Sequence, residues 1–275
     1  MAEDAVLRLG DGRALGCAEY GNPAGEPFFY FHGHPASRLE ARFAGPAAAA
    51  AGVRIVALDR PGCGRSDWQP GRAILDWPAD VAQAADLLGI GEFSVVGASG
   101  GGPYALACAY KLPDRVRRAG VLSGPAPYNA PGVTRGVRWQ NRVGFRLSSR
   151  WPVLAGFLMR SMARNMQQRP ARTIEAVARA LSQVDAEVVR RPEVTEVLVA
   201  DFAEAFRQGS QGAAWDMVLL GRAWGFPLRE IKPTVHMWHG QADTLVSPAM
   251  GSYLAEQIPH CEAHLLAGEG HLLVI

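Results

Sequence analysis

Short apolar runs alternate along the chain with longer windows in which apolar residues recur at helical spacing. Runs of this kind, bounded by glycine and proline, are typical of strands, and the longer windows are typical of amphipathic helices. The predicted strands are Ala5–Leu9, Ala14–Tyr20, Pro27–Phe31, Arg54–Leu58, Glu92–Val96, Arg117–Leu122, Thr234–Trp238 and Ala263–Leu266. The predicted helices are Ser37–Ala51, Asp76–Leu88, Pro103–Lys111 and Pro248–Gln257.

Alternation of strand and helix predicts an α/β fold, with a mostly parallel sheet and helices on both faces. Gly12 separates the first two runs by so few residues that we expect them to form an antiparallel hairpin.

The middle of the chain has a different pattern, in which one helical window follows another. Pro152, Pro170 and Pro192 each precede helix-forming residues, as expected for proline at the first position of a helix. We therefore predict an all-helical cap over 125–232, inserted between two parts of one core, 1–124 and 233–275.

Composition narrows the class of protein. Apolar residues make up 48% of the 275 residues and charged residues 20%, which is ordinary for a globular domain and excludes disordered, collagen-like and disulfide-scaffold proteins. The longest apolar stretch, 44–56, is interrupted by Gly45, Pro46, Gly52 and Arg54, so we expect no membrane-spanning helix.

Cysteine spacing and the first residues predict a cytoplasmic location. The four cysteines have no Cys-x-x-Cys spacing, which favours reduced thiols and argues against structural zinc. The acidic start Met1–Asp4 has no apolar signal core.

Charge is unevenly distributed, although the net charge of +2 predicts no nucleic-acid partner. The segment 125–232 has 16 basic and 9 acidic residues, a balance of +7, whereas the remainder has 12 and 17, a balance of −5. Arg138, Arg142, Arg146 and Arg150 recur every fourth residue and form one basic helix face. That face is a solvated surface, a patch for an anionic substrate tail or acidic carrier protein, or an interfacial helix on anionic lipid.

The most informative stretch is Gly97-Ala98-Ser99-Gly100-Gly101, which lies between a predicted strand and a predicted helix. Gly-x-Ser-x-Gly in that context is typical of a nucleophile elbow, a tight turn that presents the serine hydroxyl above the sheet. A nucleotide-binding loop is the alternative for these glycines, but they follow the fifth strand and no Gly-Lys-Ser/Thr is present.

A serine nucleophile needs a base and an orienting acid, which follow it in the order acid, then histidine, in this architecture. Asp243 follows the strand Thr234–Trp238, and His271 follows the last predicted strand in a glycine-rich loop. His260 and His264 compete for the role of base, but one lies in a predicted surface turn and the other within a strand. The backbone amides of Gly100 and His34 are the candidate oxyanion donors.

Five motifs together resemble the α/β-hydrolase fold family. They are His32-Gly33-x-Pro35, Asp59-Arg60-Pro61-Gly62-Cys63-Gly64-Arg65-Ser66, the elbow, Gly240-x-x-Asp243 and Gly268-x-Gly270-His271, and they occur in the family's order and approximate spacing. The resemblance implies an eight-stranded sheet, a helical cap after the sixth strand and a catalytic triad without a cofactor. It assigns Ser99 as nucleophile, His271 as general base and then acid, and Asp243 as the residue that orients His271.

One departure from the family concerns the end of the sequence. The family has a helix behind the sheet after the histidine loop, whereas only Leu272-Leu273-Val274-Ile275 follows His271 here.

Two other chemistries are less favoured. His32 and His34 form a His-x-His pair, but Pro35-Ala36-Ser37-Arg38 follows where a binuclear metal site needs Asp and His, so we predict no metal. Cys63 and Cys108 are alternative nucleophiles, although small buried cysteines are the more common case.

We expect the cap to roof an apolar pocket, because its helices are rich in aromatic residues and methionine. The candidate substrate contacts are His32, Gly33, Trp139 and Trp215.

The expected function is a serine hydrolase that cleaves a small or medium apolar carboxylic ester through an acyl-serine intermediate. Thioester hydrolysis, carbon–carbon bond hydrolysis and perhydrolysis use the same triad, and a non-catalytic ligand-binding protein on this scaffold is the alternative from another class. The expected partner is a small-molecule substrate, and the sequence does not indicate which oligomeric state the protein has.

Overall fold

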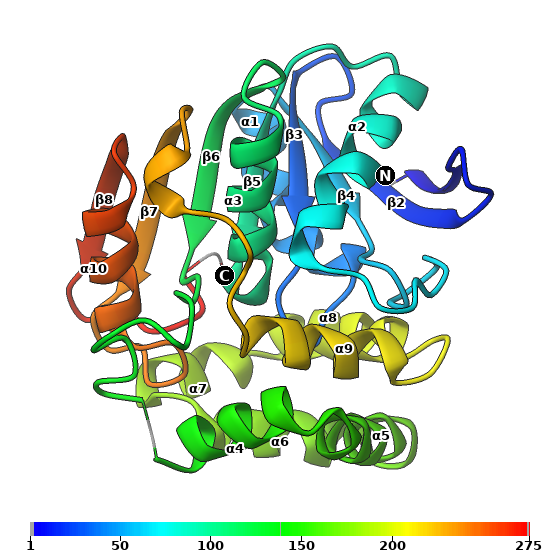
Figure 1. Ribbon diagram of the computed structural model, residues 1–275. Coiled ribbons are helices and arrows are strands. Elements are labelled where there is room, and N and C mark those ends of the chain that lie inside the picture. The colour runs from blue at the N-terminus through cyan, green and yellow to red at the C-terminus, as the bar shows by residue number, and fades with distance from the viewer. Residues whose placement is uncertain (1–2, 138, 274) are drawn as a thin grey trace.

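An eight-stranded sheet forms the centre of the computed structural model, which describes residues 3–137, 139–273 and 275 (Figure 1). Its strands are β1 (Glu3–Arg8), β2 (Ala14–Gly21), β3 (Glu26–Phe31), β4 (Val53–Leu58), β5 (Phe93–Ala98), β6 (Val116–Leu122), β7 (Thr234–Gly240) and β8 (Cys261–Leu266). Each overlaps one predicted run.

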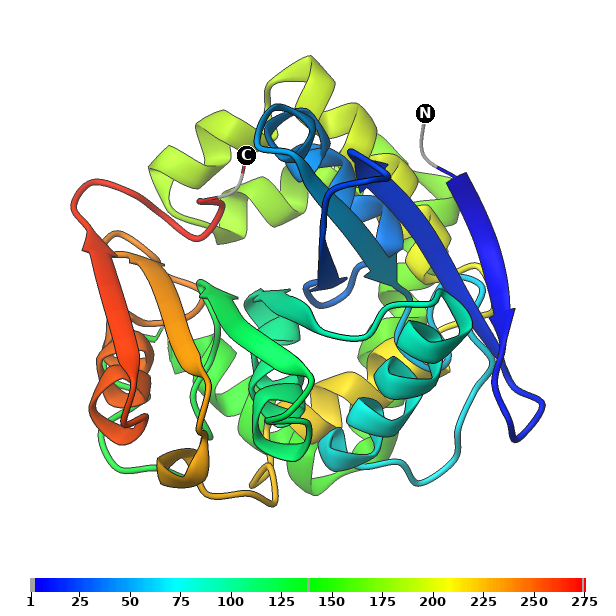
Figure 2. The same cartoon turned by 90° about the horizontal axis from the view of Figure 1, so that it is seen from above.

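The strands lie in the order β1-β2-β4-β3-β5-β6-β7-β8. Figure 2 follows this order from β8 in red to β1 in dark blue. Strand β2 pairs antiparallel with β1 and with β4, and all other neighbours are parallel. The predicted fold class and the predicted hairpin are confirmed.

Helices cover both faces of the sheet because apolar side chains on the central strands alternate between them. On β3, Phe29 and Phe31 pack with α2 (Trp77–Leu87) and α3 (Gly102–Lys111), whereas Tyr30 packs with α1 (Gly45–Ala50) on the other face. Helix α10 (Pro248–Gln257) lies on the same face as α3 and packs against β7 and β8.

The predicted helix Ser37–Ala51 is interrupted in the structure. A 3-10 helix, Arg38–Ala44, precedes α1, which begins at Gly45 with Pro46 in its first turn. Proline lacks an amide hydrogen and its ring clashes with the preceding turn, so it ends one helix and starts the next.

Between β6 and β7, the described residues form six α-helices, which make a second layer with its own apolar cluster. They are α4 (Trp139–Arg150), α5 (Pro152–Gln168), α6 (Pro170–Ala180), α7 (Gln183–Val189), α8 (Pro192–Ala205) and α9 (Gln211–Leu220). The predicted proline starts of α5, α6 and α8 are confirmed. Val133 and Trp224, near the two ends of the inserted segment, pack in the main core instead, and the division at 125 and 232 stays a prediction.

None of the helices in the described part of the chain combines the length and apolar content needed to cross a bilayer.

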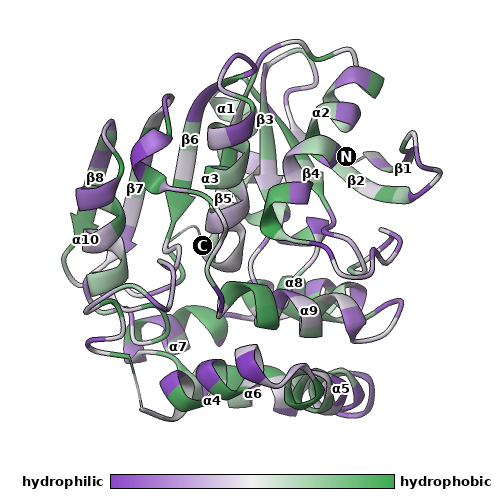
Figure 3. Cartoon of the chain, viewed as in Figure 1, coloured by the Kyte–Doolittle hydropathy of each residue, from purple (hydrophilic) through white to green (hydrophobic). Residues whose placement is uncertain are grey.

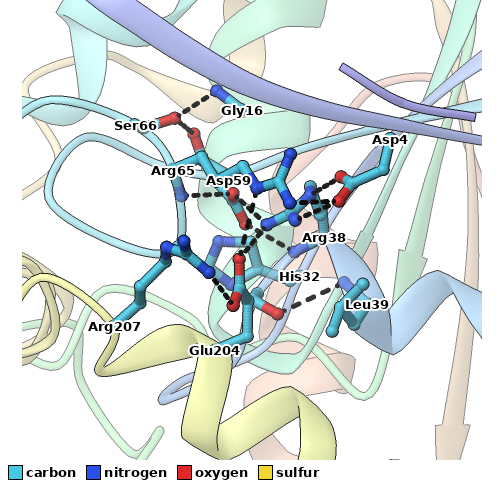
Figure 4. Close-up of polar contacts among 12 residues, drawn as sticks. Asp4, Gly16, His32, Arg38, Leu39, Asp59, Arg65, Ser66, Glu204 and Arg207 are labelled. Atoms are coloured by element: carbon cyan, nitrogen blue, oxygen red, sulfur yellow. Dashed lines mark hydrogen bonds and ion pairs between the residues drawn. The ribbon is translucent and has the colours of Figure 1, made fainter. Parts of the chain in front are cut away.

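Buried charges connect the helical layer to the core (Figure 4). The guanidinium of Arg38, which is 1% exposed, donates to Asp59 at 2.7 Å, to Asp4 of β1 at 2.6 Å and to Glu204 of α8 at 2.7 Å. One arginine therefore joins the first strand, the turn after β4 and a cap helix.

A second buried group surrounds Asp216 of α9. Its carboxylate accepts from Arg60 Nε at 2.7 Å, from the Tyr104 hydroxyl at 2.8 Å and from the guanidinium of Arg72. Burial alone raises the pKa of Asp216, but Arg60 and Arg72 outweigh it and hold the pKa far below its ordinary value.

We expect Asp216→Ala to lower the free energy of unfolding by about 3–5 kcal/mol, because two buried guanidinium groups lose their counter-charge. Denaturant titration of the wild-type and variant proteins measures this loss. Glu196→Ala, at an exposed carboxylate of α8, is the matched control. Equal stability of both variants would show that the buried ion pairs contribute no more than surface charges.

Candidate active site

Ser99 lies at the carboxyl end of β5, where the chain turns sharply into α3. Its φ is 47°, a left-handed conformation that is unfavourable for a residue with a side chain. The turn lifts the hydroxyl above the edge of the sheet.

Two glycines make this turn possible. A Cβ on Gly97 would overlap the carbonyl oxygen of Gly101, and a Cβ on Gly101 would overlap that of Phe31. The glycines of the Gly-x-Ser-x-Gly motif are therefore required by close backbone approach.

His271 and Asp243 complete a continuous line of hydrogen bonds with Ser99. His271 Nε2 lies 2.9 Å from Ser99 Oγ, and His271 Nδ1 lies 2.7 Å from Asp243 Oδ2. The other oxygen of Asp243 accepts the amides of Leu245 and Val246, at 2.8 and 2.9 Å, which fixes the plane of the carboxylate. The three residues proposed from sequence thus come together from three separate loops.

The electrostatics of His271 depend on its carboxylate neighbours. Burial lowers its pKa, but the charge and hydrogen bond of Asp243 outweigh this effect, and Asp185 and Glu40 add to it, so the pKa lies above its ordinary value. His271 is 8% exposed. A neutral Nε2 that accepts the serine proton is consistent with Nδ1–H donating to Asp243.

The loop after β3 brings His34 against the elbow. A Cβ on Gly100 would lie 3.4 Å from the His34 amide nitrogen, so the two amides proposed as oxyanion donors are neighbours. The Gly33 amide donates to Glu40 Oε2 at 2.7 Å, and Arg60 donates to the carbonyls of His32 and Gly33. These bonds fix the loop from behind.

A small cavity of about 60 Å³ adjoins Ser99. Apart from His34, Ser99 and Gly100, its lining is mostly apolar, and the lining residues include no carboxylate. Tyr128 and Phe145 stack in its wall with ring centroids 5.1 Å apart. Besides His34, Ser99 and Gly100, the cavity is lined by Pro125, Tyr128, Phe145, Leu220, Leu245 and Val246.

Residues 26–275 match the sequence model of the alpha/beta hydrolase fold family. The chain belongs to this family. The resemblance predicted from the five motifs is therefore confirmed.

The relatives of this alpha/beta hydrolase act on different bonds. A proline iminopeptidase of Neisseria gonorrhoeae is 37% identical over 105 residues, which cover 36% of this chain and 33% of the relative. An epoxide hydrolase B of Mycobacterium tuberculosis is 38% identical over 105 residues, covering 37% of this chain and 29% of the relative. The matched segment spans about one third or less of these curated relatives.

Among solved structures, an esterase from Exiguobacterium antarcticum has the same fold, with a TM-score of 0.73 and 16% identity over 99% of this chain and 94% of that chain. Family membership supports a hydrolase activity for this chain.

Three of the proposed substrate contacts do not face the cavity of the hydrolase. Both ring nitrogens of His32 are engaged, Nδ1 with the Gly33 carbonyl and Nε2 with the Arg60 amide, and burial with the Arg60 charge lowers its pKa well below the ordinary value. Trp139 is 67% exposed on α4, and Trp215 donates its Nε1 to the Arg72 carbonyl. Phe145 and Leu220 lie in the cavity wall instead.

Gly33 lies beside the nucleophile, since a Cβ added to it would lie 3.5 Å from Ser99 Cβ. Because its amide is taken by Glu40, it leaves the His34 amide as the donor nearest to Gly100. Arg138, one of the four arginines of the predicted basic face, lies outside the described residues.

Metal and thiol chemistry have little support at the serine. Both ring nitrogens of His32 are engaged, and the Nε2 of His34 donates to the Ala213 carbonyl at 2.7 Å. In the described part of the chain, His236, Glu262 and His264 form the one group with metal-ligating atoms close together, and they lie on β7 and β8 rather than on the catalytic loops. Burial raises the pKa of the Cys63 thiol to about 12, which makes it a poor nucleophile.

One buried residue near the triad was not predicted from sequence. Asp185 of α7 accepts the Leu272 amide at 2.8 Å and the Ser182 hydroxyl at 2.6 Å, and a Cβ on Gly270 would overlap its carboxylate. It therefore fixes the loop that carries His271. In the sequence it is an ordinary carboxylate in a helical window, and only the fold shows what it contacts.

Proposed function

We propose that this chain is a serine hydrolase of small carboxylic esters that carry a short apolar acyl group. The observation that supports it best is the line from Asp243 through His271 to Ser99, beside two neighbouring backbone amides. This is the arrangement that activates a serine for attack on a carbonyl.

In the proposed reaction, Ser99 Oγ attacks the ester carbonyl while His271 Nε2 takes its proton. Asp243 holds the Nδ1–H bond and stabilises the imidazolium, and the Gly100 and His34 amides donate to the oxyanion. The imidazolium gives its proton to the departing alcohol. His271 then takes a proton from water, which attacks the acyl-serine carbonyl. The imidazolium returns the proton to Ser99 Oγ as that C–O bond breaks, which releases the acid and restores the serine.

Serine at position 99 favours acyl transfer over the opening of an epoxide. An acyl-serine is an ester, which water can cleave under the same base. A serine that opened an epoxide would form an ether, which has no carbonyl for water to attack, and the enzyme would stop after one turnover.

The cavity also argues against an aminopeptidase. A substrate with a charged amino group needs a carboxylate or several acceptors to replace its hydration. The residues that line the cavity include no carboxylate and are mostly apolar. Thioester hydrolysis, carbon–carbon bond hydrolysis and perhydrolysis use the same triad and are secondary candidates after ester hydrolysis.

Labelling with a fluorophosphonate tests the mechanism. We expect a stoichiometric adduct on Ser99, detected by intact and peptide mass, and loss of labelling in Ser99→Ala and His271→Ala. Ester turnover should fall about 10⁴-fold or more in both variants. His260→Ala, at an exposed histidine, is the control. A wild-type protein that binds esters but is neither labelled nor active would instead be a ligand-binding protein.

Acyl selectivity should follow the size of the cavity. We expect p-nitrophenyl acetate and propionate to be cleaved faster than the octanoate ester, because about 60 Å³ holds only a few heavy atoms. Phe145→Ala should raise the octanoate-to-acetate ratio of kcat/KM about tenfold or more. Val143→Ala, on the exposed side of the same helix, should leave the ratio unchanged. Equal ratios in the Phe145 variant and wild type would show that Phe145 does not limit the length of the acyl group, which we expect to occupy this cavity (the acyl pocket).

Asp185 is proposed as a positioning residue for His271. Because a base acts only when neutral and the pKa of His271 is raised, the acid limb of kcat/KM should lie above the ordinary histidine value. Asp185→Asn keeps an acceptor but removes a negative charge, so the limb should move to lower pH. Asp185→Ala also frees the loop, and kcat should fall about 10- to 100-fold.

Glu187→Gln, which removes an exposed charge from the same helix, controls for that experiment. Partial recovery of kcat in the asparagine variant would separate a positioning role from simple loss of folding. An unchanged acid limb and an unchanged kcat in both Asp185 variants would contradict the assignment.

A further inference from the structure

Helix α4 and the first turns of α5 belong to the layer of the cap farther from the sheet (Figure 1), and they expose an unusual set of side chains. We call it the α4–α5 face. Both helices turn other residues inward, such as Ala155 and Met159 of α5, which pack in the cap's apolar cluster. The face consists of Trp139, Arg142, Val143, Arg146, Arg150, Trp151, Val153, Phe157 and Arg160, all exposed.

Large apolar side chains gather on this face. Trp139 is 67% exposed, Phe157 69% and Val153 86%. Among the described residues, the exposed tryptophan and phenylalanine side chains are Trp139, Trp151 and Phe157, and all belong to the α4–α5 face. Exposed aromatic residues collected in one place are typical of an interaction site.

The same face is basic and lacks a counter-charge. The sequence has nine arginines between 135 and 172 and no aspartate or glutamate between 115 and 174. In the described structure, none of the ion pairs involves Arg142, Arg146, Arg150 or Arg160. Figure 3 shows hydrophilic and hydrophobic residues interleaved along α4.

We propose that the α4–α5 face docks on an anionic phospholipid bilayer. Arginines near a negatively charged surface bind its phosphate groups, while tryptophan, phenylalanine and valine enter the boundary of the acyl chains. A second copy of the chain is a poor partner for this face, because a two-fold contact would bring like charges together. An acidic macromolecule accounts for the arginines and gives no partner for Val153 and Phe157.

Docking of this kind places the active site at the lipid surface. Phe145 lines the cavity beside Ser99, whereas Arg142 and Arg146 of the same helix are exposed. One helix therefore separates the bilayer from the acyl pocket. The docking proposal itself does not depend on the ester chemistry.

Vesicle sedimentation of the full chain tests the proposal. We expect binding to vesicles made of equal parts of phosphatidylcholine and phosphatidylglycerol, little binding to phosphatidylcholine alone, and weaker binding as salt is raised. The triple variant Arg142→Gln, Arg146→Gln, Arg150→Gln should bind about 100-fold more weakly, since each arginine near the surface contributes about a factor of five. Trp151→Ala with Phe157→Ser should bind at least about tenfold more weakly.

The control is Lys111→Gln, Arg118→Gln, Lys232→Gln, which removes three exposed charges that lie outside α4 and α5 and should keep wild-type binding. Turnover of a water-soluble ester, or the unfolding temperature where turnover is absent, confirms that all variants are folded. An equal loss of vesicle binding in the control triple variant would show that binding depends on the net charge of the protein and not on the α4–α5 face. Unchanged binding in the Trp151 and Phe157 variant would contradict insertion of the apolar side chains and leave only electrostatic attraction, and no sedimentation of wild type would overturn the proposal.

Discussion

The left-handed backbone of Ser99 is the constraint on which the site depends. A residue with a side chain pays about 1–3 kcal/mol for such a conformation, so the surrounding structure must impose it. Strand β5 enters the turn between two parallel neighbours, and α3 follows it packed in the core. Because both elements are fixed in place, the turn between them cannot relax to a lower-energy backbone conformation. Gly97 and Gly101 remove the side chains that would collide at the crossing, and the hydroxyl is left where His271 Nε2 reaches it.

The cap contributes to this geometry through buried and partly buried acids as well as through apolar contact. Asp185 holds the histidine loop, Asp201 accepts the amide and hydroxyl of Ser37, Glu204 pairs with Arg38, and Asp216 pairs with Arg60 behind the oxyanion loop. Buried pairs of this kind are weak sources of net stability, because desolvation offsets their attraction. Their directional bonds instead select one arrangement of cap and core.

Much of the fold and of the candidate site could be predicted from sequence, because those features are encoded locally. Strand periodicity, Gly-x-Ser-x-Gly, and the order of Ser99, Asp243 and His271 each depend on neighbouring residues or on chain order. The substrate contacts could not be predicted in this way. Trp139 and Phe145 lie on one helix and are both aromatic, yet one faces solvent and the other the cavity. Which face of a cap helix turns inward is decided by tertiary packing, and so is the pairing of Asp185 or Asp216.

Charge on the cap is separated in a way that links these observations. The acids that bond the core come from α7, α8 and α9, whereas α4 and α5 have arginines and no acids. A ligand shifts a conformational equilibrium only by its difference in affinity for the two conformations. A bilayer that binds all positions of α4 equally well would therefore bring the enzyme to the membrane without changing its conformation. Activation would require a bilayer to favour a position of α4 in which Phe145 leaves the acyl pocket. Helix α4 packs on α9, which carries Asp216, and its Ser149 carbonyl accepts from Arg222. A shift of α4 must therefore break this contact, whereas Asp185, which holds the histidine loop, lies on α7.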